Sequence, residues 1–247
     1  GCYAKVIKLS QQSEPEIFAT THQFGTILEN VTVDVNTREL DLNDDSITEN
    51  TRGSYPLTSI PNASYLGIGH TPRNILMLTA DAFGVMPAIA KLTHEEAEYY
   101  FLSGYTAKVA GTERGIIEPS ATFSPCFGAP FMPMKPKVYT DMLSKKLKET
   151  GADVWLINTG WTGGPYGIGH RMKIEHTRAM VNAILDGSLA KIPTEADPVF
   201  GIQVPIHCPG VPTEILKQKD SWKNPEDYDI QANKLVSMFK DNFAQFL

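Results

Sequence analysis

The chain has 247 residues, of which 42% are hydrophobic and 20% are charged, a composition typical of a soluble globular protein. Its net charge of −6 provides no attraction to nucleic acid or to an anionic membrane, and neither is expected as a partner. No run of about 18 apolar residues predicts a membrane-spanning helix, and three widely spaced cysteines fit a reducing cytoplasm better than a disulfide framework.

The first part of the chain predicts strands and turns. Residues 27–35, ILENVTVDV, alternate as a half-buried strand does, and residues 43–46 form a polar turn. Residues 75–78 are a short apolar run that ends in Thr79-Ala80-Asp81. This pattern predicts a buried strand whose end delivers Asp81 to a loop. We expect the carboxylate to anchor the loop, and a binding role is the less favoured alternative.

Helices are predicted further along the chain. Thr93 and Glu96 have the spacing of a capping box, which predicts a helix that runs to about residue 105. Residues 108–133 have no regular periodicity, and a connection of that length is typical of a functional lid or a linker. Further helices are predicted at residues 136–151, 173–185 and 225–247, the last with Leu235, Met238 and Phe239 inward.

A glycine-rich loop follows a second apolar run. Residues 154–158 predict a buried strand, and residues 160–169, GWTGGPYGIG, separate it from the helix at 173–185. The loop matches neither GxxxxGK[ST] nor GxGxxG, so a wide structural turn and a ligand cradle are equally supported by its spacing. Arg171 after the loop and Thr177 on the helix favour a cradle, since they put a cation and a hydroxyl near a helix N-terminus. The whole pattern predicts one α/β domain.

Other polar residues form no recognisable catalytic or metal-binding pattern. Arg52, in ENTRGSYP, has the chemistry to clamp a carboxylate or phosphate, but a salt bridge with Glu49 or another nearby acid is favoured from the residues alone. The six histidines lack HExxH spacing, and we expect no metal ligands within the chain.

Long strings of the sequence resemble the ATP-dependent phosphoenolpyruvate carboxykinase family. They run in the same order as in that family and cover essentially the whole chain: GCYAK at the start, ENTRGSYP around Arg52, LTADAFGVMP at 78–87, FLSGYTAKVAGTERGIIEP at 101–119, TFSPCFGAPF at 122–131 and NTGWTGGPYGIGHRMKIEHTRAM at 158–180. The resemblance implies conversion of oxaloacetate and ATP to phosphoenolpyruvate, carbon dioxide and ADP, a step of gluconeogenesis. It also implies a mixed-sheet C-terminal domain fragment over residues 1–247, with a lid at about 103–125.

The resemblance assigns site residues in the first part of the chain. Arg52 matches an arginine that contacts both ATP and the phosphoenolpyruvate side of the site, and Lys5 matches a lysine close to the reacting phosphates. Both are expected to be catalytic. Glu14 matches a glutamate that contacts ATP.

The remaining assignments by resemblance concern the nucleotide. Arg171 and Met172 match an adjacent pair that meets the nucleotide, and Thr177 matches a threonine near the adenine. The residues that bind Mg²⁺ or Mn²⁺, the P-loop and the oxaloacetate-binding residues precede GCYAK in the family. We therefore expect a fragment that is inactive without an N-terminal portion. The alternatives are a non-enzymatic nucleotide-binding or interaction module that retains the fold, and a relative that uses GTP.

Overall fold

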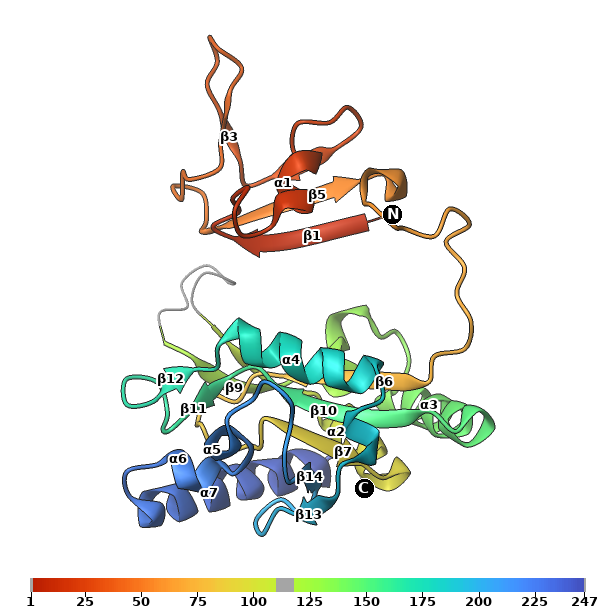
Figure 1. Ribbon diagram of the computed structural model, residues 1–247, viewed down its shortest axis with the longest axis vertical. Coiled ribbons are helices and arrows are strands. Elements are labelled where there is room, and N and C mark those ends of the chain that lie inside the picture. The colour runs from red at the N-terminus through yellow and green to blue at the C-terminus, as the bar shows by residue number, and fades with distance from the viewer. Residues whose placement is uncertain (1, 110–117, 247) are drawn as a thin grey trace. The chain divides into compact units, whose positions relative to one another are not determined.

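The computed structural model describes residues 2–109 and 118–246, which form two compact units. One unit comprises Gly1–His70 with Lys108–Glu118, and the other comprises Thr71–Ala107 with Pro119–Leu247 (Figure 1). The sequence pattern predicted one domain over residues 1–247. The two units arise because residues 60–73, which contain prolines and glycines, form neither helix nor strand.

The first unit is built on a small antiparallel sheet. Its strand order is β1 (Cys2–Ile7), β5 (Asn50–Tyr55), β2 (Ile27–Glu29), and the unit also contains α1 (Pro15–Thr20), the pair β3 (Thr32–Val33) and β4 (Leu40–Asp41), and the short helix η1 (Leu57–Ser59). The single strand predicted at residues 27–35 is divided into β2 and β3. Asn30 divides it because its backbone has φ 60°, a left-handed conformation that asparagine tolerates and that no strand continues through.

The second unit contains a five-stranded mixed sheet. Its order is β13 (Thr194–Ala196), β14 (Gln203–Pro205), β7 (Ile89–Leu92), β10 (Asp153–Asn158), β6 (Asn74–Thr79). β10 pairs with β6 in parallel and with β7 antiparallel. Both predicted strands, β6 and β10, are present. β10 is buried as expected, whereas in β6 Met77 is buried and Leu78 is 55% exposed. The α/β class with a mixed sheet is confirmed.

The second unit also contains the helices α2 (His94–Ser103), α3 (Pro136–Thr150), α4 (Ile174–Leu185), α5 (Thr213–Leu216), α6 (Gln218–Ser221) and α7 (Pro225–Ala244). The capping box of Thr93 and Glu96 is present at α2. Gly151 ends α3 in the left-handed conformation. On α7, Leu235 and Phe239 are buried as predicted.

Short elements fill part of the region expected to be irregular. β8 (Tyr105–Lys108) pairs with β9 (Ser120–Phe123), and η2 (Pro125–Phe127) and η3 (Ala129–Phe131) follow. Residues 110–117, at the centre of the lid predicted at about 103–125, lie outside the described residues. The lid function stays a prediction.

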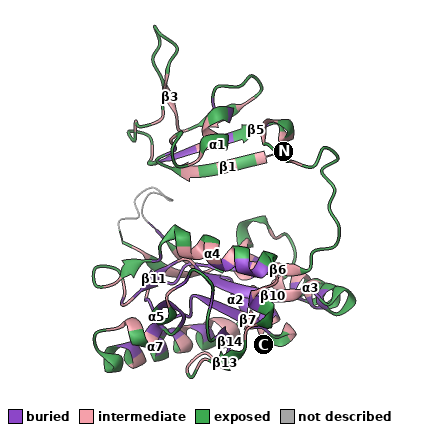
Figure 2. Ribbon diagram, in the orientation of Figure 1, coloured by how far each residue is buried: buried purple, intermediate pink, exposed green. Residues whose placement is uncertain are grey.

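The core of the second unit lies around β10. Figure 2 shows buried residues concentrated on the central strands, and Val154 to Ile157 of β10 are each no more than 2% exposed. Burial on both faces explains why β10 reads as a continuous apolar run rather than as an alternating one.

Candidate functional site

Two loops leave the same end of the second unit's sheet. β6 and β10 are parallel neighbours in register, with Thr79 opposite Asn158, so the segments that follow them emerge side by side. Asp81 follows β6, and the glycine-rich loop follows β10. Ligands of open α/β sheets characteristically bind at the carboxyl ends of parallel strands. This edge is therefore the place where the sheet offers a site.

Asp81 holds the first loop in shape. Its side chain is fully buried and accepts backbone N–H bonds from Phe83 at 2.9 Å, Val85 at 2.7 Å and Met86 at 2.9 Å. The Tyr105 hydroxyl donates to Asp81 Oδ1 at 2.8 Å. The prediction that Asp81 anchors a loop is confirmed. Burial, and then the Asp81 carboxylate, raise the pKa of Tyr105 well above its usual value, so the hydroxyl stays protonated as a donor.

Asn158 ties the two loops together. Its Oδ1 accepts the N–H of Asp81 at 3.0 Å and that of Gly160 at 2.8 Å, while its Nδ2 donates to the Met86 carbonyl at 3.0 Å. The sequence analysis did not identify this residue. Two signals were available in the sequence. One is a polar amide at the end of an apolar strand, and the other is a carboxylate, Asp81, two residues after the end of a second apolar strand.

The contact between the loops requires glycine at two positions. A Cβ on Gly160 would lie 2.2 Å from the backbone N and O of Asp81, and one on Gly84 would lie 2.2 Å from the carbonyl oxygen of Gly164. Gly84 also has φ 71°, which strains other residues. Part of the glycine content thus serves close packing of backbone on backbone, a structural role that does not require a ligand.

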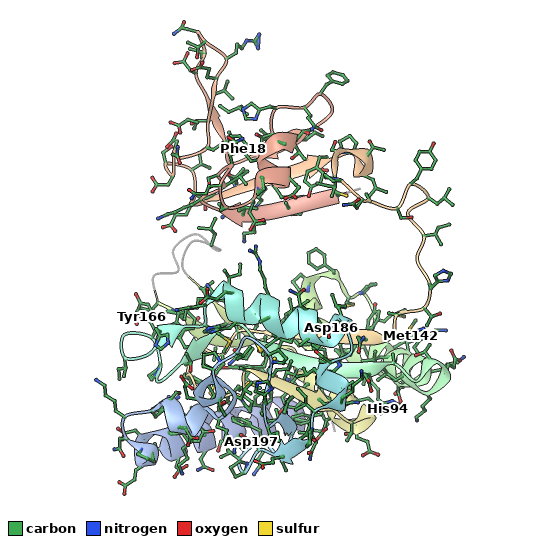
Figure 3. All side chains as sticks on the ribbon, in the orientation of Figure 1. Phe18, His94, Met142, Tyr166, Asp186 and Asp197 are labelled. Atoms are coloured by element: carbon green, nitrogen blue, oxygen red, sulfur yellow. The ribbon has the colours of Figure 1, made fainter. Side chains whose placement is uncertain are left out.

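The base of the glycine-rich loop is fixed, whereas its tip is exposed. β11 (Trp161–Thr162) pairs with β12 (His170–Arg171) to close the base. The Thr162 hydroxyl donates to Gln218 Oε1 at 2.8 Å, and the Gly163 N–H donates to the Ser221 hydroxyl at 3.0 Å. At the tip, Tyr166, labelled in Figure 3, is 50% exposed.

Arg171 is held at this base with its guanidinium exposed to solvent. It lies opposite Trp161 in the β11–β12 pair, and its Cζ is 5.6 Å from the centroid of the indole ring. Its Nε donates to the Thr159 carbonyl at 3.3 Å. One donor and the ring fix the plane of the guanidinium, and its terminal NH₂ groups have the geometry to bind a phosphate or carboxylate. Trp161 was not identified from the sequence, since its pairing with Arg171 across the loop was not predicted.

Met172 and Thr177 follow Arg171 toward α4. Met172 is 6% exposed, and its N–H donates to the Gly160 carbonyl at 2.8 Å, so its side chain belongs to the core. A ligand contact at this position would therefore involve the backbone carbonyl. Thr177 is half-buried in the second turn of α4. Arg171, Met172 and Thr177 thus occupy one short stretch of the second unit.

In the first unit, the structure brings Lys5 and Arg52 together. They are directly opposite on β1 and β5, and Glu29 of β2 is opposite Arg52 on its other side. Arg52 Nε donates to Asn50 Oδ1 at 3.0 Å, and its Nη1 is 3.9 Å from Glu29 Oε2. The acid paired with Arg52 is therefore Glu29 on the adjacent strand, rather than Glu49.

Glu14 lies at another part of the first unit's sheet. It immediately precedes α1 and lines a cavity together with Cys2 and Tyr55, which pair at the opposite end of β1 and β5 from Ile7. Lys5 and Arg52 are three residues along their strands from that pair, a distance of about 10 Å.

Comparison with known proteins identifies the family. A family model described as phosphoenolpyruvate carboxykinase matches residues 1–214. The chain belongs to this family. It is 60% identical over 246 residues to a protein from Brucella anthropi, 59% to one from Geotalea uraniireducens and 57% to one from Pelobacter propionicus, each named phosphoenolpyruvate carboxykinase (ATP). All of this chain is covered in these comparisons, but it spans only 46% of the length of each relative.

The described residues of this carboxykinase-family chain do not fit a resident metal ion. Within residues 2–109 and 118–246, no three His, Cys, Asp or Glu side chains gather as a metal site requires. The exposed guanidinium of Arg171 does fit the phosphates or base of a nucleotide. None of the helices in these same ranges combines the length and the apolarity needed to cross a bilayer.

Proposed function

We propose that this chain is part of an ATP-dependent carboxykinase that converts oxaloacetate and ATP into phosphoenolpyruvate, carbon dioxide and ADP. The observation that carries the proposal is the fixed, exposed Arg171 beside the two loops that follow β6 and β10. Identity of 57–60% over the entire chain with proteins named for this activity supports it. A role in gluconeogenesis and a cytoplasmic location go with the proposed activity, and three free cysteines are consistent with that location.

We assign the nucleotide to the loops of the second unit. Arg171 would bind the nucleotide through its terminal donors, Met172 would contact it through the backbone, and Thr177 would lie near the adenine. The Asp81 and Asn158 hydrogen bonds make the surface rigid before the ligand arrives. A preorganised surface of this kind loses less entropy on binding than a mobile one.

The first unit would supply positive charge to the reacting groups. Phosphoryl transfer gathers negative charge on the transferring group and the attacking enolate, so cations that are already in place lower the barrier. Lys5 and Arg52 provide two adjacent cations on one sheet face, and Asn50 with Glu29 orients the Arg52 guanidinium. Glu14 would contact ATP, and residues 103–125 would close over the ligands.

This chain spans only 46% of the length of its relatives, and we assign the rest of the reaction's machinery to the portion that it does not span. Since the described residues offer no metal site, we place the Mg²⁺ or Mn²⁺ ligands in an N-terminal portion, together with the oxaloacetate-binding residues. The chain alone is then expected to be inactive.

A chimera tests the proposal. The segment of the Brucella anthropi relative that matches this chain is replaced by residues 1–247, and ATP-dependent release of carbon dioxide from oxaloacetate is measured. We expect turnover from the chimera and none from the 247-residue chain. A folded chimera that binds ATP without turnover would instead support a nucleotide-binding module that has lost the chemistry. Faster turnover with GTP than with ATP would contradict the nucleotide assignment.

A further inference from the structure

A cavity of about 270 Å³ lies in the second unit, and none of the residues assigned above lines it. Its walls are β13 and β14, the turn after β13, the α5–α6 segment, and Tyr228 at the start of α7. All of these elements belong to one compact unit, so the cavity is defined without reference to the other unit.

The inner wall of the cavity is apolar. Val204, Leu216 and Tyr228 line it and are 8%, 1% and 2% exposed. The Tyr228 hydroxyl donates to the Val85 carbonyl at 3.3 Å, so this polar atom is already satisfied. A ligand in the cavity would therefore put a hydrocarbon body against this wall.

The charged side chains around the cavity are predominantly acidic. Both lysines of the lining are already paired: Lys217 lies 3.1 Å from Glu195, and Lys219 lies 2.7 Å from both carboxylate oxygens of Asp229. The lining also contains Asp197 and Asp220, and neither of them forms an ion pair with any residue of the described ranges. Two carboxylates are thus left without a cation.

Asp197, labelled in Figure 3, is held in place by the backbone. Its Oδ1 accepts the N–H groups of Val199 at 2.9 Å and Phe200 at 2.7 Å. Burial raises the pKa of Tyr228, and the Asp197 carboxylate raises it further, ahead of Asp229 and Asp81. The Asp197 carboxylate therefore acts electrostatically on Tyr228, which lines the cavity.

We propose that this cavity binds a small organic cation, a primary ammonium group carried on an apolar body. The ammonium group would lie between Asp197 and Asp220, and the body would lie against Val204 and Leu216. A water molecule takes up roughly 30 Å³ of the liquid, so the cavity is several times larger than one water and has room for a small organic molecule. A divalent metal ion fits less well, because no group of three suitable ligands is present among the described residues.

The cavity is connected by hydrogen bonds to both loops of the candidate site. Gln218, which lines the cavity and is 2% exposed, accepts the Thr162 hydroxyl at the base of the glycine-rich loop. Tyr228 bonds to Val85 in the loop that Asp81 anchors. A ligand that shifts either side chain would alter these loops, and coupling of this kind acts in both directions. The binding site itself does not depend on the proposed reaction.

Three matched probes test the charge requirement: 2-phenylethylamine, 2-phenylethanol and phenylacetate. Binding of each to the 247-residue chain is measured by isothermal titration calorimetry at pH 7. We expect the amine to bind about tenfold more tightly than the alcohol and the carboxylate not to bind. No amine binding at concentrations up to about 10 mM, or equal affinity for amine and alcohol, would overturn the proposal. If phenylacetate bound more tightly than the amine, the proposal would also be overturned, and Lys217 or Lys219 would be the binding group instead.

Two isosteric variants locate the site. Asp220→Asn removes an exposed charge, and Asp197→Asn retains an oxygen for the Val199 and Phe200 N–H groups, so both are expected to fold. Each substitution should weaken the binding of 2-phenylethylamine by about tenfold. Asp241→Asn makes the same change in net charge on an exposed position, 13 residues from Tyr228 along α7, and should leave the affinity unchanged. If all three substitutions weakened binding equally, the binding would be a non-specific attraction to negative charge, and the proposed site would be refuted.

Discussion

Replacement of Tyr105 by phenylalanine removes one buried hydroxyl from the loop that Asp81 anchors. The hydroxyl of Tyr105, a residue that is 1% exposed, donates to Asp81 Oδ1 at 2.8 Å, whereas its ring packs 5.1 Å from Phe239 and 5.3 Å from Phe123. Phenylalanine keeps the ring contacts and removes the hydroxyl, which donates to Asp81 and also accepts from the Ala82 backbone N–H. A hydrogen bond to a charged group contributes about 1.5–3 kcal/mol, so the free energy of unfolding should fall by about that amount.

Asp81→Asn should cost more. The carboxylate accepts one N–H from Phe83 on Oδ1 and two from Val85 and Met86 on Oδ2, so either orientation of an asparagine amide sets its NH₂ against a backbone donor. In the orientation that satisfies Val85 and Met86, the NH₂ group would also face Tyr105, whose hydroxyl can turn to accept it. The two substitutions should therefore be non-additive, with an interaction energy of about 0.5–3 kcal/mol.

Urea unfolding monitored by tryptophan fluorescence measures the stability of the second unit, because Trp155, Trp161 and Trp222 all lie in it. Tyr139→Phe is a matched control, because its hydroxyl only accepts a bond from the Met134 N–H at 3.2 Å in an exposed setting. A change below about 0.5 kcal/mol for Tyr105→Phe, with full additivity to Asp81→Asn, would refute the idea that this hydroxyl helps to hold the loop.

One further substitution and one pH experiment test the second unit. Gly160→Ala should destabilise the second unit by about 1–3 kcal/mol in urea unfolding, since its Cβ would meet the Asp81 backbone at 2.2 Å; an unchanged midpoint would mean that the loops separate easily. Above pH of about 10, where unfolded tyrosines lose protons, the folded unit keeps its buried tyrosines protonated because burial raises the pKa of Tyr100, Tyr105 and Tyr228. The unfolded state then binds fewer protons, so the free energy of unfolding should fall as pH rises, by up to about 1.4 kcal/mol per pH unit for each tyrosine. Urea midpoints that stay constant from pH 8 to pH 11, at fixed ionic strength, would contradict this.

Local signals predicted much of the second unit. β10 was found because a strand buried on both faces requires a continuous apolar run, and β6 was found from its shorter apolar run although Leu78 is 55% exposed. α2 was found because Thr93 and Glu96 form reciprocal bonds within one helical turn. The break at Asn30 was missed, since a left-handed residue is permitted by asparagine but not required by it.

The contacts that shape the site join residues far apart in the sequence. Asn158 bonds to the Asp81 N–H across 77 positions, and Tyr105 bonds to the Asp81 side chain across 24. Periodicity and turn chemistry describe neighbours along the chain, so they carry no information about such pairs. The assignments of Lys5, Glu14 and Arg52 came only from the resemblance, because a single charged residue on a strand or before a helix has no distinctive pattern.

The effect of Arg171 on nucleotide binding tests the central claim most directly. In the chimeric enzyme, Arg171→Gln should raise the KM for ATP by about 10- to 100-fold, the equivalent of one charge-assisted hydrogen bond or a bidentate pair, while the KM for oxaloacetate changes little. Lys173→Gln, at an exposed position two residues away, is the control, since its ammonium is 3.4 Å from Glu175. Equal KM values for ATP in the parent, Arg171→Gln and Lys173→Gln chimeras would contradict the assignment of these loops to the nucleotide.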